Sequence, residues 1–185
     1  AEKEKRSQLQ PDEVQAVLSA YGFPFPQSAT VATKAEAEKV AAHFKKPFVL
    51  KIVSPDIIHK SDAGGVILNV TKETLESSYD TLLANVKAKA PKARIEGVYM
   101  GEMAPTGGKE LILGIKEEPG LGKLIMLGLG GIYVEVFRDA SFRFAPLMKE
   151  DAEEMLGELK SIALLKGARG EEGADLEAIT DAVGR

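Results

Sequence analysis

One short polar segment brings together several groups that could handle phosphate. The segment HKSDAGG, residues 59–65, lies between the apolar runs 48–53 and 66–70. The neutral imidazole of His59 is abundant near pH 7 and can act as a nucleophile, while glycine lets backbone N–H groups turn towards an anion. Two interpretations stay open at this point: a solvated hairpin tip, which Asp and Gly commonly form, or a loop that receives phosphate on His59.

Lys51 is the second candidate, because it interrupts the apolar run FVLKIV. Burying an unpaired ammonium is costly, so the side chain must either reach solvent along its aliphatic stem or meet an anion. The functional interpretation makes Lys51 a lysine that binds phosphate.

A further group of residues could contact a nucleoside. In the segment Gly101-Glu102-Met103, the backbone could read the edge of an adenine, with Met103 against the ring. Glu110 interrupts another apolar run and could meet ribose hydroxyls. A strand that ends before Pro105 and a surface glutamate explain the same residues without a ligand.

Metal ligands are harder to find in the sequence. It contains no HExxH motif and no calcium loop, and Glu135 and Asp139 are candidates without a spacing argument. His43 has the character of a cation near a helix end, and Arg143 that of an outward-facing residue on a strand. The sequence itself therefore assigns no metal site.

The composition excludes several classes of protein. With 44% hydrophobic and 28% charged residues, the 185-residue chain can bury a core as one domain or two small lobes. It has no cysteine, and its net charge of −4 lacks the basic character of a nucleic-acid binder. Neither a membrane-spanning run nor a secretory signal is present, so a cytoplasmic location is expected.

Periodicity and turn residues predict an α+β protein of two lobes, 1–100 and 101–185, with the first helix free to pack on either. The predicted helices are 11–21, a helix capped by Thr33 that stops before Pro47, 72–89, 150–159 and 175–183. The predicted strands are 48–53, 66–70, 95–103, 109–116, 123–129, 132–137 and 140–147, with 48–53 and 66–70 as an antiparallel pair.

Three longer segments resemble the ATP-grasp domain of ADP-forming acyl-CoA synthetases, and most of all the β subunit of the acetyl-CoA synthetase of that kind. They are VLKIVSPDIIHKSDAGGV (49–66), GEMAPTGGKELILGI (101–115) and MLGLGGIYVEVFRDASFRFAPL (126–147), in the order of the family. The resemblance implies an ATP-grasp fold, in which two α+β lobes enclose a nucleotide cleft.

The resemblance also implies an activity. Such enzymes interconvert acyl-CoA, ADP and phosphate with a carboxylic acid, CoA and ATP, and the phosphoryl group travels on two histidines. By motif match His59 is one of them. The other belongs to the partner, a CoA-binding domain or α subunit.

The resemblance further implies the nucleotide contacts, with Mg²⁺ beside ATP or ADP. Lys51 would bind the phosphates, and the loop with Gly64 and Gly65 would lie over them. Glu102 and Met103 would hold the adenine, and Glu110 would lie near the ribose.

Two departures from the family pattern modify these expectations. Relatives usually read V-Q-E-M where this chain has Met100-Gly101-Glu102-Met103, so a glutamine side chain is absent and a looser hinge is expected. Relatives also continue into an E-[LI]-[DN]-I-N-P-L strand and an aspartate that carry the magnesium ligands, which are therefore expected beyond residue 185. The chain is accordingly expected to represent part of a longer protein and to turn over ATP weakly or not at all on its own.

A different class of function stays open beside the enzyme. Protein lysine acetyltransferases contain a similar synthetase-like region that serves regulation without catalysis. The intact motif that begins at His59 favours the enzyme, whereas the altered hinge favours the regulatory module.

Overall fold

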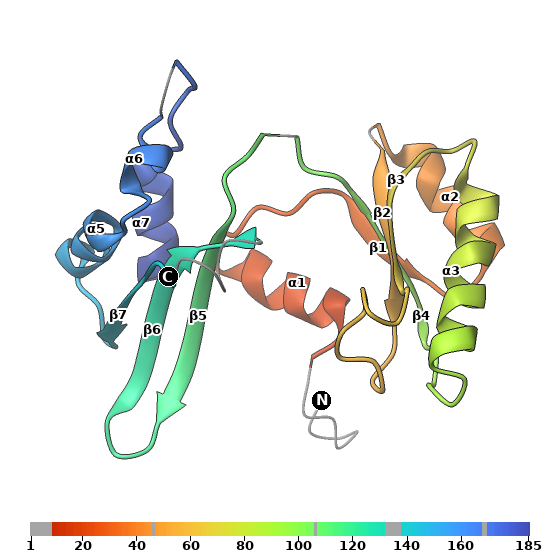
Figure 1. Cartoon of the computed structure of the whole chain (residues 1–185), viewed down its shortest axis with the longest axis horizontal. Helices are drawn as coiled ribbons and strands as arrows, with labels where there is room; N and C mark the ends of the chain where they lie inside the picture. Colours follow the sequence, from red (N-terminus) through yellow and green to blue (C-terminus); the bar gives the residue numbers. More distant parts are fainter. Residues whose placement is uncertain (1–8, 46, 106, 132–137, 168–169) are drawn as a thin grey trace. The chain divides into compact units, whose positions relative to one another are not determined.

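The computed structural model describes residues 9–45, 47–105, 107–131, 138–167 and 170–185. The chain forms two units, Ala1–Pro105 and Thr106–Arg185, and each has its own antiparallel sheet (Figure 1). Among the described residues, no helix has both the length and the apolar character needed to cross a membrane.

The first unit contains a four-stranded sheet in the order β1-β4-β2-β3, in which all neighbours are antiparallel. Its elements are α1 (Pro11–Ala20), β1 (Ser28–Val31), α2 (Lys34–His43), β2 (Phe48–Val53), β3 (Val66–Val70), α3 (Leu75–Lys89) and β4 (Gly97–Glu102). The predicted strands 48–53 and 66–70 and their antiparallel pairing are confirmed. The short strand β1 was not predicted.

Local sequence signals determine where α2 begins. The Thr33 side chain accepts a hydrogen bond from the backbone N–H of Glu36, 3.2 Å away, which caps the helix as predicted. In a capping box the Glu36 carboxylate would accept from the N–H of Thr33. Here it accepts instead from the N–H of Ala32, one residue earlier, at 2.8 Å.

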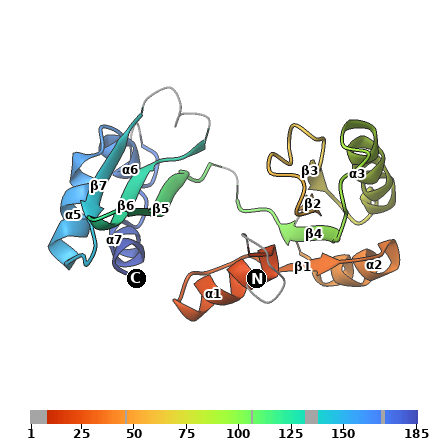
Figure 2. The same ribbon diagram turned by 90° about the horizontal axis from the view of Figure 1, so that it is seen from below.

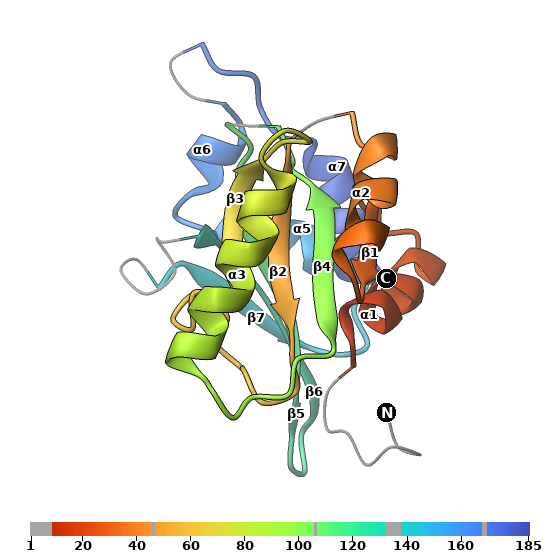
Figure 3. The same ribbon diagram turned by 90° about the vertical axis from the view of Figure 1, so that its right-hand side faces the viewer.

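The sheet of the first unit has two different faces, because side chains alternate along each strand. Leu50 and Ile52 of β2 join Val98 and Met100 of β4 in a hydrophobic core that also contains Leu82 of α3. Figure 3 shows α3 lying across this face of the sheet, and Figure 1 shows α1 on its other side. The residues between the core positions, such as Lys51, therefore belong to the face that α3 does not cover.

The division between the units falls after Pro105. Gly101 and Glu102, which the sequence analysis assigned to the second lobe, are the last residues of β4. This strand pairs with both β1 and β2 and so lies inside the first sheet.

The second unit contains a three-stranded sheet in the order β5-β6-β7. Its elements are β5 (Leu111–Glu118), β6 (Gly122–Leu129), β7 (Ala140–Phe144), α5 (Lys149–Glu158), α6 (Ile162–Leu165) and α7 (Leu176–Gly184). Figure 2 shows the strands side by side with α5 next to them. Ile125 and Leu127 of β6 form a core with Met155 of α5 and Val183 of α7. The predicted strand 132–137 lies outside the described residues, and α6 was not predicted.

Arg143 joins β7 to α5 rather than pointing freely outward. Its guanidinium lies 2.6 Å from the Glu158 carboxylate and 3.4 Å from that of Glu154, and the Ser141 hydroxyl also donates to Glu158. The hydrogen bonds from Arg143 and Ser141 lower the pKa of Glu158 to about 2. This cluster fastens the helix to the last strand of the sheet.

Glu158→Gln is expected to remove a stabilising interaction that depends on pH. Because the pKa of Glu158 falls from an ordinary 4.5 to about 2 in the folded chain, the contribution is fully present above about pH 4.5 and is lost as the pH falls towards about 2. The difference in Tm between the original chain and Glu158→Gln should therefore shrink across that window. Glu153→Gln, on the same helix, is the control; a Tm difference for Glu158→Gln that does not change with pH would contradict the assignment.

Candidate functional site

The loop that carries His59 is tied to the rest of the first unit at several points. Ile57 is buried in the hydrophobic core. The Asp56 carboxylate accepts from the N–H of Arg94 at 2.7 Å, and Nζ of Lys89 on α3 donates to the Asp62 carbonyl at 3.0 Å. These contacts hold both halves of the loop, while His59 between them is exposed.

The two glycines close the loop tightly. Gly64 has a φ of +68°, a conformation that favours glycine. A Cβ at Gly65 would lie 2.5 Å from Cγ2 of Ile52 and 3.1 Å from the Lys60 carbonyl oxygen. A side chain at residue 65 would therefore push the loop away from β2.

The N–H groups of Gly64 and Gly65 were expected to face an anion, but they close turns within the loop instead. Gly64 donates to the Ser61 carbonyl at 2.9 Å, and Gly65 donates to that of Lys60 at 2.7 Å, so neither amide is available to an anion in this structure. In contrast, the amides of Lys60, Ser61 and Asp62 donate no hydrogen bond to any described residue. The available donors therefore follow His59 directly.

Lys51 lies on β2 with its side chain exposed, between neighbours that are buried. Its Nζ is 5.9 Å from the centroid of the Tyr99 ring, within the range of a cation–π interaction. A cavity of about 440 Å³ is lined by Lys51, Lys60 and Tyr99, together with residues of α1 that include Val14. The structure thus places both lysines on one cavity beside the His59 loop.

The expected adenine-binding residues are largely engaged within the first unit. The N–H of Glu102 donates to the Gln27 carbonyl and that of Met103 to the Pro47 carbonyl, both at 2.9 Å. The Glu102 carboxylate accepts from the N–H of Lys45 at 2.5 Å. An adenine edge at this place would therefore meet carbonyl oxygens rather than these two amides.

Gly101 does not leave empty space at the hinge. A Cβ there would lie 2.9 Å from the Tyr99 hydroxyl and 3.0 Å from Cε1 of the ring. The ring of Tyr99 therefore fills the place that a side chain at residue 101 would take. Tyr99 was not among the predicted site residues, since only the strand register brings it to Lys51 and Gly101.

Glu110 belongs to the second unit and is exposed beside a pair of glycines. The N–H of Gly130 donates to the Glu110 carbonyl at 2.7 Å, and a Cβ at Gly131 would lie 2.8 Å from the Glu110 carboxylate. A cavity of about 540 Å³ is lined by Glu110, these glycines and Leu165. Glu110 thus lies at a cavity whose walls include the backbone of two glycines.

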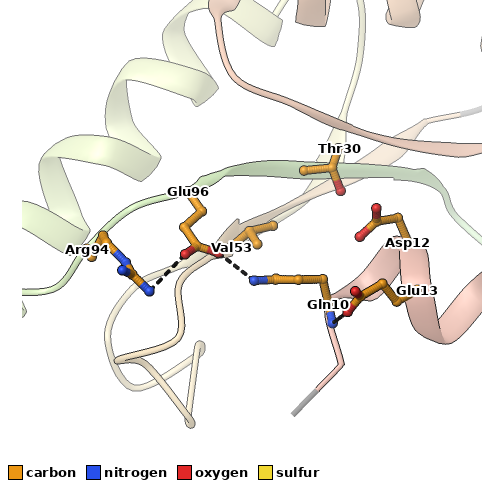
Figure 4. Close-up of a pocket in the computed structure, with 7 residues that line it drawn as sticks. All are labelled: Gln10, Asp12, Glu13, Thr30, Val53, Arg94 and Glu96. Carbon is orange, nitrogen blue, oxygen red and sulfur yellow. Dashed lines mark hydrogen bonds and ion pairs between the residues drawn. The ribbon is translucent and has the colours of Figure 1, made fainter. Parts of the chain in front are cut away.

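A further cavity in the first unit has acidic walls. Its volume is about 480 Å³, and it is lined by Gln10, Asp12, Glu13, Thr30, Val53, Arg94 and Glu96 (Figure 4). Arg94 and Gln10 both contact the Glu96 carboxylate, and the Glu13 carboxylate accepts from the N–H of Gln10. Three carboxylates make this cavity a poor place for the phosphates of a nucleotide.

Among the described residues, no group of three or more His, Cys, Asp or Glu side chains is arranged to hold a metal ion. The Asp139 carboxylate accepts from the N–H groups of Lys160 and Ser161, both at 2.8 Å. Burial alone would raise the pKa of Asp139, but interactions with the Ser161 side chain and with the backbone N–H groups of Lys160 and Ser161 outweigh it and leave that pKa below its usual value. Glu135 lies outside the described residues.

Comparisons with known proteins identify the class to which this fold and loop belong. The profile of the ATP-grasp domain matches residues 1–185. The β subunit of acetate–CoA ligase [ADP-forming] I from Pyrococcus furiosus is 42% identical over 184 residues, which cover 99% of this chain and 78% of that subunit. The chain therefore belongs to the ATP-grasp domain family, in the branch found in ADP-forming acyl-CoA ligases.

Two further proteins show how much of each relative this chain matches. The 4-hydroxybutyrate–CoA ligase [ADP-forming] of Nitrosopumilus maritimus is 47% identical over 184 residues. The match covers 99% of this chain but only 26% of that ligase. The structure of a dinucleotide-forming acetyl-coenzyme A synthetase 1 from Ca. Korarchaeum cryptofilum, in complex with coenzyme A, Ca-AMPCP and HgCl⁺, matches with a TM-score of 0.94. It is 43% identical, and the match covers 100% of this chain and 80% of that one. The predicted family and the α+β ATP-grasp fold are confirmed.

Gly65→Ala is expected to destabilise the chain, because the new methyl group would overlap Cγ2 of Ile52 in the core. Overpacking of this kind costs about 1–3 kcal/mol of unfolding free energy. Gly157→Ala is the matched control, since a Cβ there meets nothing within 4 Å and alanine favours the helix by about 0.5–1 kcal/mol. Urea unfolding should show opposite signs for the two variants; equal stability of Gly65→Ala and the original chain would contradict the packing described here.

Proposed function

We propose that this chain is the nucleotide-binding part of an ADP-forming acyl-CoA ligase, with His59 as a phosphoryl carrier. The complete reaction converts acyl-CoA, ADP and phosphate into a carboxylic acid, CoA and ATP. The partner is a CoA-binding domain or subunit that carries a second phosphohistidine and loads His59. The names of the similar ligases support this assignment.

One observation carries the proposal: His59 is exposed on a loop whose two halves are held by hydrogen bonds. The three backbone N–H groups that follow it donate to no described residue. A phosphoryl group on the imidazole nitrogen would lie beside the amides of Lys60, Ser61 and Asp62. Amide donors and ammonium groups both stabilise phosphate oxygens. The loop therefore offers a nucleophile and the groups that hold its phosphorylated form.

The transfer step moves the phosphoryl group from His59 to the nucleotide. A terminal oxygen of ADP forms the new P–O bond while the P–N bond of phosphohistidine breaks and its electron pair stays on the ring nitrogen. The other ring nitrogen carries a proton, so the imidazole leaves in its neutral form. Lys51 and Lys60 line the neighbouring cavity and would reduce the repulsion between the two phosphate groups. A carrier that accepts and releases the group in two steps keeps CoA and the nucleotide at separate sites.

The proposal includes the expected positions of the nucleotide. Lys51 binds the phosphates, Gly64 and Gly65 shape the loop next to them, Glu102 and Met103 lie at the adenine, and Glu110 lies near the ribose. Mg²⁺ neutralises charge on the β- and γ-phosphates in reactions of this type, and its ligands would come from outside the described residues. A regulatory module of a protein lysine acetyltransferase is not favoured, since the relatives compared above are ligases.

Lys51→Ala is expected to weaken ADP binding by about 1–3 kcal/mol, which is the range for a hydrogen bond to a charged group. Isothermal titration of the chain with ADP measures this loss. Lys39→Ala on α2 is the control, because Lys39 is exposed and lies on none of the cavities described above. Equal ADP affinity of Lys51→Ala and the original chain would return Lys51 to a purely structural role.

His59→Ala is expected to abolish transfer of phosphate to ADP. The chain has two histidines, His43 and His59, and both are exposed, so the chemical donor phosphoramidate should phosphorylate either one. After the donor is removed, ADP and Mg²⁺ are added, and ATP is measured in a single turnover.

His43→Ala provides the matched control, because it leaves His59 as the only histidine. It should form ATP slowly, whereas His59→Ala, which retains His43, should form none. If phosphorylated His59→Ala, in which only His43 can carry the phosphate, forms ATP as fast as phosphorylated His43→Ala, the carrier role of His59 is wrong.

A further inference from the structure

Lys51 has a specific neighbour on the next strand. In the register of β2 and β4, Lys51 is directly opposite Tyr99, and side chains of directly opposite residues lie on the same face of a sheet. This is the face that α3 does not cover, since Leu50, Ile52, Val98 and Met100 occupy the other one. The ammonium of Lys51 and the ring of Tyr99 are 5.9 Å apart, measured from Nζ to the ring centroid.

Gly101 determines where the Tyr99 ring can lie. Residues 99 and 101 are two apart on β4 and so share a face. The ring extends over Gly101, where an added Cβ would be 2.9 Å from the hydroxyl, 3.0 Å from Cε1 and 3.2 Å from Cζ. A Cβ 2.9 Å from the hydroxyl oxygen is closer than van der Waals contact allows, so a side chain at residue 101 would require the end of the Tyr99 side chain to move.

The Tyr99 ring is also a wall of the cavity that contains Lys51 and Lys60. The Tyr99 side chain is half-buried, and no described residue hydrogen-bonds to its hydroxyl. No carboxylate is within ion-pair distance of the Lys51 ammonium among the described residues, so the ring is the group that attracts it there. A free lysine side chain has many rotamers, and fixing it in one of them costs entropy. A ring beside the ammonium already restricts these rotamers, so less entropy is lost when an anion binds.

We propose that Tyr99 is a positioning residue that holds the Lys51 ammonium in the cavity for the phosphates of a nucleotide, and that Gly101 provides the space in which the ring does so. This inference rests on the proposed nucleotide-binding role of Lys51. It changes the meaning of Gly101, since the missing side chain at the hinge makes room for Tyr99 instead of loosening the hinge.

The contact itself can be tested without a nucleotide. Protons held over an aromatic ring resonate upfield, so the ε-methylene signal of Lys51, assigned by its absence from Lys51→Arg, should lie upfield of the other lysines in a ¹H–¹³C spectrum. The displacement should persist in Tyr99→Phe, which keeps the ring, and disappear in Tyr99→Leu. In Gly101→Ala it should decrease, because the new methyl group displaces the ring.

The effect on binding is measured with ADP as the probe. Tyr99→Leu should weaken ADP binding about 2- to 5-fold, the size expected for a cation–π interaction at an exposed site. Tyr99→Phe should bind like the original chain, and Gly101→Ala should show a loss similar to that of Tyr99→Leu. Adding Gly101→Ala to Tyr99→Leu should cause no further loss, because the two changes then act through the same contact.

The outcomes separate this inference from the proposed function. If Lys51→Ala weakens ADP binding but Tyr99→Leu does not, Lys51 is a nucleotide ligand and the positioning role of Tyr99 is wrong. If the original chain does not bind ADP at all, the proposed function fails and the inference fails with it. If Tyr99→Phe loses as much affinity as Tyr99→Leu while the Lys51 signal stays upfield, the hydroxyl rather than the ring is responsible, and the inference is likewise overturned.

Discussion

The alternation of side chains along the paired strands β2 and β4 is the constraint on which the candidate site depends. On one face, Leu50 and Met100 are buried beneath α3. Because successive side chains point to opposite faces, the burial of these residues forces Lys51 and Tyr99 onto the other face. The face on which the Lys51 side chain lies is thus decided by core formation, and its neighbour Tyr99 by the register between the two strands.

The loop after β2 extends the same arrangement. Gly65 lies so close to Ile52 that the loop must fold back over the end of the strand, and its amide is used to close the turn. Glycine therefore acts here by fitting the backbone against the core. The polar atoms left for a ligand are those of His59 and of the three residues that follow it. The site is consequently built from one strand pair and one tied loop, and both depend on the packing of α3.

The local parts of the fold were predictable, and the distant pairings were not. The strands 48–53 and 66–70 were predicted at their observed bounds, because an apolar run and turn residues are local signals. The strand predicted at 95–103 was divided between the two lobes at residue 101, whereas β4 pairs with β1 and β2 in the first sheet. β1 has four residues and too little periodicity to be recognised without its partner. Strand pairing between residues far apart in the sequence leaves no local pattern.

The sequence by itself indicated the family, the polar loop around His59, and Lys51 and His59 as candidate site residues, because these depend on the order of residue types along the chain. It also indicated that Gly101 lacks a side chain at the hinge. Only the tertiary structure decided what occupies that space, which loop amides are free, and that Tyr99 lies opposite Lys51. The pairing of Lys51 with Tyr99 joins segments far apart in the sequence, and the course of the loop and of the Tyr99 side chain is set only once the strands have paired and the core has closed.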